Sequence, residues 1–305
     1  MHEIILRKAK QSGFSQILNE DNMINQCTTA RRLTISKSID NVLVKIIDSK
    51  IRSLFISNIV ELPESSMSTL SQDNFKLMRV LDFEDAQINY VPEEVRKLFH
   101  LHYLSLKNTK VKMLPKTIGK LLNLETLDFK MTLVSELPIE IKNLKRLCYL
   151  VIVRSDSPYF SYGKGTKIQE GFGSLMYLRK LDGVQVNSKA LEELKKLRHL
   201  RIVGLGQSSL TEDPMRVLHI LPNLLWLSLS EAYSGEKLHW FPKLQELLLY
   251  GLKGLKCIMI EDGAMPLLER LQISACLLLK EIPDGVENLR NLSCLQFHDM
   301  LKDVA

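Results

Sequence analysis

The residue types that support catalysis occur in this chain without the spacing that catalysis needs. The 305-residue sequence contains no GxSxG, HExxH or GxGxxG motif, and its histidines and cysteines are not grouped at metal-ligand spacing. The five cysteines are odd in number and scattered, which is typical of a reducing compartment. We therefore predict that the protein is not an enzyme and that this chain holds neither a metal nor a cofactor.

Two local features could be taken for chemistry, and each has a simpler structural interpretation. The sequence GKGTK at residues 163–167 is similar to a phosphate-binding loop, but no strand pattern leads into it and no helix pattern follows. We interpret it as a basic loop. Glu93 and Glu94 open a predicted helical turn, where carboxylates stabilise the N-terminal end of the helix dipole. A structural role is therefore favoured over acid–base catalysis.

Composition and charge exclude several broad classes of protein. Hydrophobic residues make up 45% of the chain and charged residues 25%, which is typical of a folded domain and not of a disordered tail. The net charge of +6 is modest for this length and does not single out nucleic acid as a partner. The apolar run near the start is short and interrupted by charges, and no stretch reaches the ~18 apolar residues of a membrane span. We expect a cytoplasmic protein.

Hydrophobic residues recur at a constant interval in the centre of the chain. The anchors Leu81, Leu104, Leu127 and Leu150 are each 23 residues apart. Further columns keep the same interval: Met78, Leu101, Leu124 and Leu147; Pro92, Pro115 and Pro138; Leu98, Leu121 and Leu144. A period of ~20 to 29 residues with LxxLxL anchors is the signature of leucine-rich repeats.

Each repeat combines a strand with a helical turn. The alternation in LxxLxL predicts a strand whose leucines face inward, and segments such as LPKTIGKL predict one turn of helix with proline at its start. One such unit cannot bury its leucines alone, so neighbouring repeats must stack. We therefore predict an α/β repeat fold, a leucine-rich-repeat solenoid shaped as a curved horseshoe. A parallel β-sheet would form its concave side, and short helices or turns its convex side.

The anchors extend with irregular spacing on both sides of the regular centre. They are interpreted as Leu33 and Leu54 before it, and Leu181, Leu200, Leu227, Leu247, Leu271 and Leu295 after it, which makes about twelve repeats. Residues 154–174 are rich in Gly, Ser, Tyr and Lys and are predicted to form a loop insertion. Residues 1–27 do not fit the repeat and predict a helix that ends near Gly13, so the repeat domain is assigned to residues 28–305.

The side chains between the leucines form the predicted concave face, and they are the candidate binding residues. The first of these repeats present Asp82, Glu84 and Asp85, after which the face becomes basic and gains aromatic residues. Arginine and large aromatic side chains dominate binding hot spots, whereas a merely solvated face favours Lys, Glu and Ser. A solvated face without a partner remains the alternative. The candidate partner-binding residues are Tyr103, Lys107, Lys130, Tyr149, Arg154, Arg179, Lys180, Arg198, Arg201, Trp226 and Tyr250.

The central repeats resemble a known family. The segments RVLDFEDAQINYVPEEVRKL, YLSLKNTKVKMLP and LPIEIKNLKRLCYLVIV resemble the repeat region of plant intracellular disease resistance proteins of the coiled-coil, nucleotide-binding, leucine-rich-repeat type (RPM-type). RRLTIS and IRSLFIS are similar to the first, irregular repeats of that family. MHEIILRKAK is similar to the last helix of its winged-helix region, which identifies residues 1–27 as a remnant of that region.

The resemblance implies a function for the chain. It implies a recognition and autoinhibition module of an innate immune receptor, whose first repeats restrain the receptor's nucleotide-binding domain and whose later surface meets a pathogen effector or a guarded host protein. ADP or ATP would bind only in an upstream domain, because this chain lacks the P-loop motif GxxxxGK[ST]. The alternatives are a stand-alone intracellular scaffold similar to small-GTPase regulators and, less favoured, an extracellular receptor ectodomain.

Overall fold

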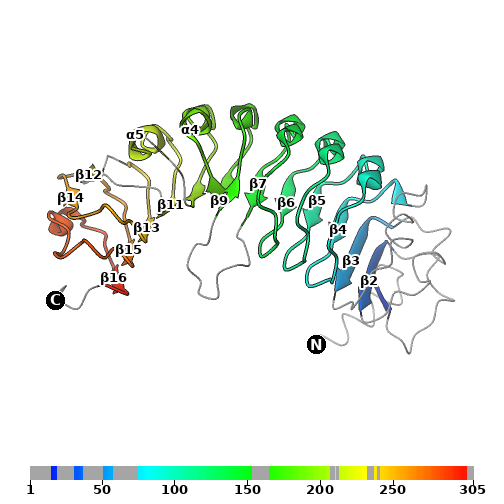
Figure 1. Ribbon diagram of the computed structural model, residues 1–305, viewed down its shortest axis with the longest axis horizontal. Coiled ribbons are helices and arrows are strands. Elements are labelled where there is room, and N and C mark those ends of the chain that lie inside the picture. The colour runs from blue at the N-terminus through cyan, green and yellow to red at the C-terminus, as the bar shows by residue number, and fades with distance from the viewer. Residues whose placement is uncertain are drawn as a thin grey trace. The chain divides into compact units, whose positions relative to one another are not determined.

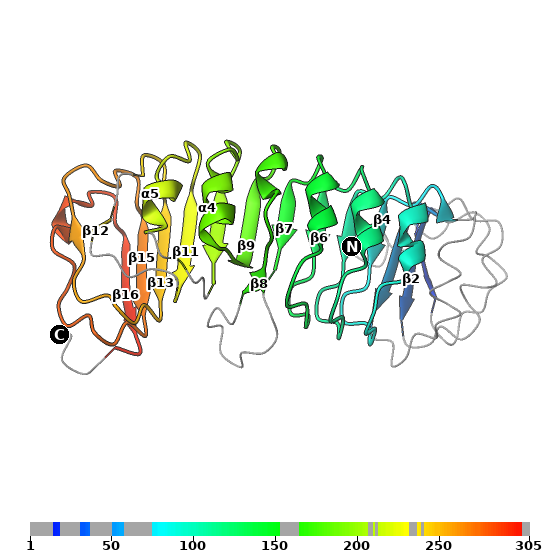
Figure 2. The ribbon, with the colours of Figure 1, turned by 45° about the horizontal axis from the view of Figure 1, so that its top comes forward.

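The computed structural model describes residues 15–18, 31–36, 51–57, 75–152, 165–206, 210, 213–231, 237–238 and 241–300. The chain divides into two compact units, Met1–Leu147 (unit 1) and Cys148–Ala305 (unit 2). Within each unit the strands lie side by side, and the helices lie away from the sheet (Figures 1 and 2). The fold is a leucine-rich-repeat solenoid, which confirms the predicted fold class.

In the described part of unit 1, parallel strands follow one another in chain order. They are β1 (Ser15–Leu18), β2 (Arg32–Ser36), β3 (Ser53–Ser57), β4 (Val80–Asp82), β5 (Tyr103–Ser105) and β6 (Thr126–Asp128). Their register brings the predicted anchors together: Leu33, Leu54, Leu81, Leu104 and Leu127 are direct cross-strand neighbours. All five are at most 2% exposed, so the anchor column forms the core of the unit.

In the described part of unit 2, the main sheet is also parallel and in chain order. Its strands are β7 (Tyr149–Val151), β9 (Lys180–Gln185), β10 (Ile202–Leu205), β11 (Trp226–Ser230), β13 (Glu246–Tyr250), β15 (Arg270–Ser274) and β16 (Cys294–His298). The short strand β8 (Thr166–Lys167) also pairs with β9, and β12 (Lys237–Leu238) pairs with β14 (Met259–Ile260) in a separate sheet.

One predicted anchor of unit 2 is wrong. Leu181 is the cross-strand neighbour of Val203, and Val203 is the neighbour of Leu227, so Val203 and not Leu200 is the anchor of this repeat. The sequence HLRIVGL offers a leucine three residues too early. Leu200 is fully buried just before the strand, and the β-branched Val203 occupies the anchor position.

The helices in the described residues are short, and those of unit 1 begin where the prolines predict. They are the 3₁₀ helices η2 (Glu93–Lys97), η3 (Lys116–Lys120) and η4 (Ile139–Asn143). Pro92, Pro115 and Pro138 are their N-cap residues, with φ between −64° and −69°. Unit 2 contains η5 (Phe172–Ser174), α4 (Ser188–Leu194), α5 (Met215–Leu218) and η6 (Val286–Asn288).

Two predicted boundaries differ from the structure in part. The helix expected up to Gly13 lies outside the described residues, but β1 pairs with β2, so a parallel strand already precedes residue 28. Residues 154–164 of the predicted loop insertion also lie outside the described residues. The repeat structure resumes within the rest of that segment, at β8 and at η5, because Phe172 is an apolar side chain that the core buries to 2% exposure.

Candidate functional site

The outward positions of unit 1 are fixed by the register of its strands. Asp82, Ser105 and Asp128 are cross-strand neighbours one position after the anchors, and Val80, Tyr103 and Thr126 are neighbours one position before them. Because successive strand residues point to opposite faces, these side chains lie on the face opposite the leucines. Equivalent residues of successive repeats therefore form polar rows on one surface.

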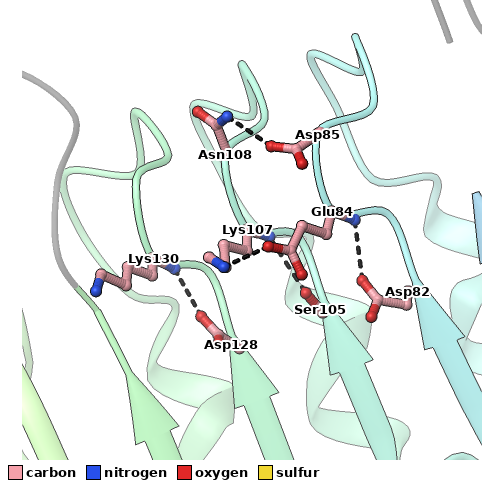
Figure 3. Close-up of polar contacts among 8 residues, drawn as sticks. All are labelled: Asp82, Glu84, Asp85, Ser105, Lys107, Asn108, Asp128 and Lys130. Carbon is pink, nitrogen blue, oxygen red and sulfur yellow. Dashed lines mark hydrogen bonds and ion pairs between the residues drawn. The ribbon is translucent and has the colours of Figure 1, made fainter. Parts of the chain in front are cut away.

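A polar network runs along this surface at the ends of β4, β5 and β6 (Figure 3). Asp82 Oδ1 accepts a hydrogen bond from the Glu84 N–H at 2.9 Å, and Asp128 Oδ1 accepts one from the Lys130 N–H at 2.9 Å. Lys107 Nζ forms an ion pair with Glu84. We call the residues of Figure 3 the unit 1 polar network: Asp82, Glu84, Asp85, Ser105, Lys107, Asn108, Asp128 and Lys130.

The next residue of each repeat extends the network through a second row. Asn108 Nδ2 donates to Asp85 Oδ1 at 2.6 Å, 23 residues away in the chain. Asp85, Asn108 and Met131 all have positive φ values, of 63°, 53° and 59°. Asn and Asp tolerate this left-handed conformation better than other non-glycine residues. The left-handed conformation of the turn after each strand thus explains why Asp85 and Asn108 occur at this position.

Burial changes the protonation equilibria in the unit 1 polar network. Burial raises the pKa of the Asp82 carboxyl, although the hydrogen bonds from the Glu84 N–H and the Ser105 hydroxyl oppose it. Burial likewise raises the pKa of the Asp128 carboxyl. The Glu84 carboxylate raises the pKa of Lys107 through their hydrogen bond. Desolvation therefore makes ionisation less favourable for two carboxyl groups that accept hydrogen bonds from the backbone.

This arrangement changes the interpretation of two predicted binding residues. Lys107 is already paired with Glu84, and Lys130 lies next to Asp128 with its ammonium group pointing away (Figure 3). Carboxylates outnumber ammonium groups in the network, so the face is not basic at these strands. Tyr103 is part of the same surface, and burial and the nearby Asp82 raise the pKa of its hydroxyl. In unit 1, Lys107 is thus already engaged by a neighbouring repeat.

Unit 2 has a depression of about 490 Å³ on the outward face of its sheet, which we call the unit 2 depression. It lies over the beginnings of β7, β9, β10, β11 and β13. The residues that line it are Tyr149, Arg179, Lys180, Asp182, Arg201, Ile202, Leu225, Trp226, Gln245 and Glu246. Five of the predicted residues thus meet in one concave site: Tyr149, Arg179, Lys180, Arg201 and Trp226.

Two arginines occupy equivalent positions on neighbouring repeats of the unit 2 depression. The Arg201 N–H donates to the Arg179 carbonyl oxygen at 2.8 Å, so the two backbones are adjacent at the start of β9 and β10. Both side chains are exposed. Within the described residues, neither guanidinium has an ion pair or a hydrogen bond with another side chain. Their charges are therefore available to a partner.

The base of the depression depends on a glycine. Asp182 is 7% exposed and lies 3.5 Å from Lys180 Nζ, measured from Oδ2. A Cβ atom on Gly204 would lie only 2.2 Å from Asp182 Oδ1, so only glycine leaves room for this carboxylate. The register of β9 and β10 also shifts here, and Gly183 has a φ of 77°. Such an irregularity bends the strand locally and changes the direction of neighbouring side chains.

The other predicted residues do not line the unit 2 depression. Tyr250 is the last residue of β13 and lies at the other end of the strand. Arg154 lies outside the described residues. Arg198 is exposed on the turn before β10, where its carbonyl oxygen accepts from Asn223 Nδ2 at 3.0 Å. Its placement on the face was wrong, because the anchor Leu200 was assigned three residues too early.

Some residues of the depression were missing from the prediction, although their distance in sequence from an anchor residue would have identified them. Asp182, Ile202, Leu225, Gln245 and Glu246 all lie within two residues of an anchor in their repeat. Restricting the candidates to lysines, arginines and aromatic residues left out the carboxylate, amide and aliphatic side chains between them. The complete set is mixed: cationic at β9 and β10, apolar at β11, and acidic at β13.

In the ranges that the structure describes, no group of three or more His, Cys, Asp or Glu side chains is placed to hold a metal ion. Among the same residues, no helix has the length and apolar character needed to cross a bilayer.

Comparison with known proteins identifies the family. The leucine-rich repeat region family matches residues 50–213, more than half of the chain, and the chain belongs to this family. A disease resistance protein of Arabidopsis thaliana is 28% identical over 359 residues, covering 96% of this chain and 40% of the relative. Disease resistance protein RPM1 of the same plant is 40% identical over 99 residues, covering 32% of this chain and 11% of the relative. These relatives confirm the resemblance to plant disease resistance proteins.

The fold is found in solved structures as well. A leucine-rich repeat protein of Leptospira interrogans aligns with a TM-score of 0.56 and 19% identity over 97% of this chain and 88% of that chain. This likeness shows the fold alone. The present chain spans about 40% of the length of the first plant relative, and the aligned 99 residues cover 11% of the second.

Proposed function

We propose that this chain is the non-catalytic recognition module of a plant innate immune receptor and acts in the cytoplasm in defence against pathogens. Two findings support the proposal: the family membership and the disease resistance relatives. The observation that carries it is the unit 2 depression, which presents two arginines without side-chain partners beside Trp226. Arginine and tryptophan are the residues that most often dominate protein interfaces.

The proposed partners are proteins. A pathogen effector, or a host protein that an effector modifies, would bind at the unit 2 depression. Nucleic acid is not favoured, because Asp182 and Glu246 interrupt the basic residues and would repel phosphates. No membrane contact is needed for this activity.

We further propose that the first repeats restrain the receptor's own nucleotide-binding domain, and that ADP or ATP bind there and not in this chain. The resemblance of RRLTIS and IRSLFIS to the first repeats of the family supports this part. Partner binding can release the restraint only if the partner binds the resting and active states with different free energies. The unit 2 depression would then set which pathogen is detected, and unit 1 the resting state.

A complementation experiment tests the proposal in the plant. The gene that encodes this chain is disrupted, and the plants are challenged with a panel of pathogen isolates. We expect susceptibility to at least one isolate that the parent plant resists, and restored resistance when the unaltered gene is returned. Equal resistance of parent and disrupted plants to every isolate would contradict a role in recognition.

Matched substitutions then locate the activity on the surface. The double variant Arg179→Ala with Arg201→Ala should fail to restore resistance, because it removes both guanidinium groups from the unit 2 depression. The control is Arg198→Ala with Arg216→Ala, which also removes two exposed guanidinium groups from this part of unit 2 but outside the depression. The control should restore full resistance. Equal behaviour of the two variants would place recognition elsewhere.

A further inference from the structure

The unit 2 depression has a charge gradient across its strands. Arg179 and Arg201 lie over β9 and β10, whereas Gln245 and Glu246 lie over β13. Lys180 at the cationic side is partly neutralised by Asp182, 3.5 Å away. The two arginines therefore provide the cationic charge that remains available at one end, and Glu246 provides a negative charge at the other.

The two arginines are close enough in the fold for one carboxylate to contact both. Paired strands lie ~4.8 Å apart, so the two side chains start about that distance from each other. Two like charges on side chains that start this close repel each other, and a single carboxylate between them would offset the repulsion and accept hydrogen bonds from both. The planar fork of arginine matches the two oxygens of a carboxylate.

Apolar side chains adjoin this cationic pair. Ile202, Leu225 and Trp226 line the same depression, and each is only partly buried by its own chain. Trp226 follows Leu225 at the start of β11, one strand beyond Arg201. A bulky apolar side chain of a partner would bury its surface here, and an aromatic one would also stack against the indole ring.

The separation of the two subsites fits an extended peptide. The point midway between β9 and β10 lies one and a half strand spacings from β11, which is about 7 Å. In an extended chain, residues i and i+2 point to the same side and are about 6.6 to 6.8 Å apart. An acidic side chain and an apolar side chain two positions apart therefore reach both subsites together.

We propose that the unit 2 depression recognises an extended partner segment in which Asp or Glu stands two residues from a bulky apolar residue. This inference rests on the proposed recognition function and specifies its partner chemistry. Glu246 fixes the orientation, because a second acidic residue beyond the apolar one would meet a like charge over β13.

Selection from a displayed library of random heptapeptides on the full-length chain tests the motif. The expected result is enrichment of Asp or Glu two positions from Trp, Phe or Leu. Selected peptides should lose about tenfold or more in affinity for the Arg179→Ala and Arg201→Ala double variant. They should keep their affinity, within about twofold, for the Arg198→Ala and Arg216→Ala control. Circular dichroism confirms that both variants are folded.

Three results would overturn the inference. The first is an enriched motif without an acidic residue, and the second is equal binding to both double variants. The third is binding of a phosphoserine peptide when its glutamate counterpart does not bind, because the site would then require a phosphate and not a carboxylate. In the second case, loss of peptide binding on Trp226→Ala would still support recognition at the depression. The complementation experiment judges the proposed function separately.

Discussion

Leucine 127 tests whether the anchor column holds the solenoid together. Its side chain is 0% exposed, and it is the cross-strand neighbour of the anchor Leu104. Leu122 provides a control of the same residue type five positions earlier, and it is 59% exposed. Leu127→Ala and Leu122→Ala therefore make the same chemical change at nearby positions, and they differ in burial.

The magnitudes follow from the burial of each side chain. Truncating a fully buried leucine removes the equivalent of three carbon groups, which is about 2.4 kcal/mol at ~0.8 kcal/mol per group. The remaining cavity raises the cost, so Leu127→Ala should lower the free energy of unfolding by ~2 to 5 kcal/mol. Leu122 is mostly in contact with solvent already, and its truncation should cost about 1 kcal/mol or less.

Urea denaturation of the full chain, followed by circular dichroism, measures the difference between the two variants. Hydrogen exchange adds a local test, because each repeat contacts only its neighbours. Protection should fall most in β5 and β6 for Leu127→Ala and stay unchanged there for Leu122→Ala. If Leu127→Ala cost no more than Leu122→Ala, Leu127 would not be an inward anchor, and the assigned register would be wrong.

Three further predictions concern individual side chains. Asp128→Asn should stabilise the fold at neutral pH and flatten its pH dependence in thermal unfolding. The folded state holds this proton more tightly than the unfolded chain, so ionisation above the raised pKa weakens folding; a lower melting temperature at pH 7 would contradict this. Gly204→Ala should displace Asp182 and reduce partner binding by about tenfold; unchanged binding would show that the carboxylate position is unimportant. Met131→Asn should raise the free energy of unfolding by about 0.5 to 1 kcal/mol, because asparagine tolerates φ of 59° better; a loss in urea denaturation would refute this.

Much of the fold follows from the sequence because one periodic signal repeats. The leucine column and the prolines recur every 23 residues in the centre, so each repeat supports the assignment of the next. The signal fails where it becomes ambiguous. In HLRIVGL a leucine precedes the strand and a valine occupies the anchor, and only the cross-strand pairing of Val203 with Leu181 and Leu227 distinguishes them.

The site was less predictable than the fold, for physical reasons. A binding surface depends on which charges are already paired, and the pairing of Lys107 with Glu84 comes from the three-dimensional register. The assignment of the anchor three residues too early also placed Arg198 on the sheet face instead of the preceding turn. Arg179 and Trp226 lie together in the unit 2 depression because the anchors of their repeats were assigned correctly. Arg201 also lines the depression, since it remains near the sheet face in the corrected register.

The central claim is that a partner binds on the sheet face at the unit 2 depression. The most direct measurement places a photo-crosslinking amino acid at Ile202, which lines the depression, or at Met176, which is 63% exposed on a turn outside it. Each variant is expressed in its plant, and leaves are irradiated with and without pathogen challenge. We predict a crosslinked protein from position 202 in challenged leaves and none from position 176. Crosslinking from position 176 but not from position 202 would contradict the claim.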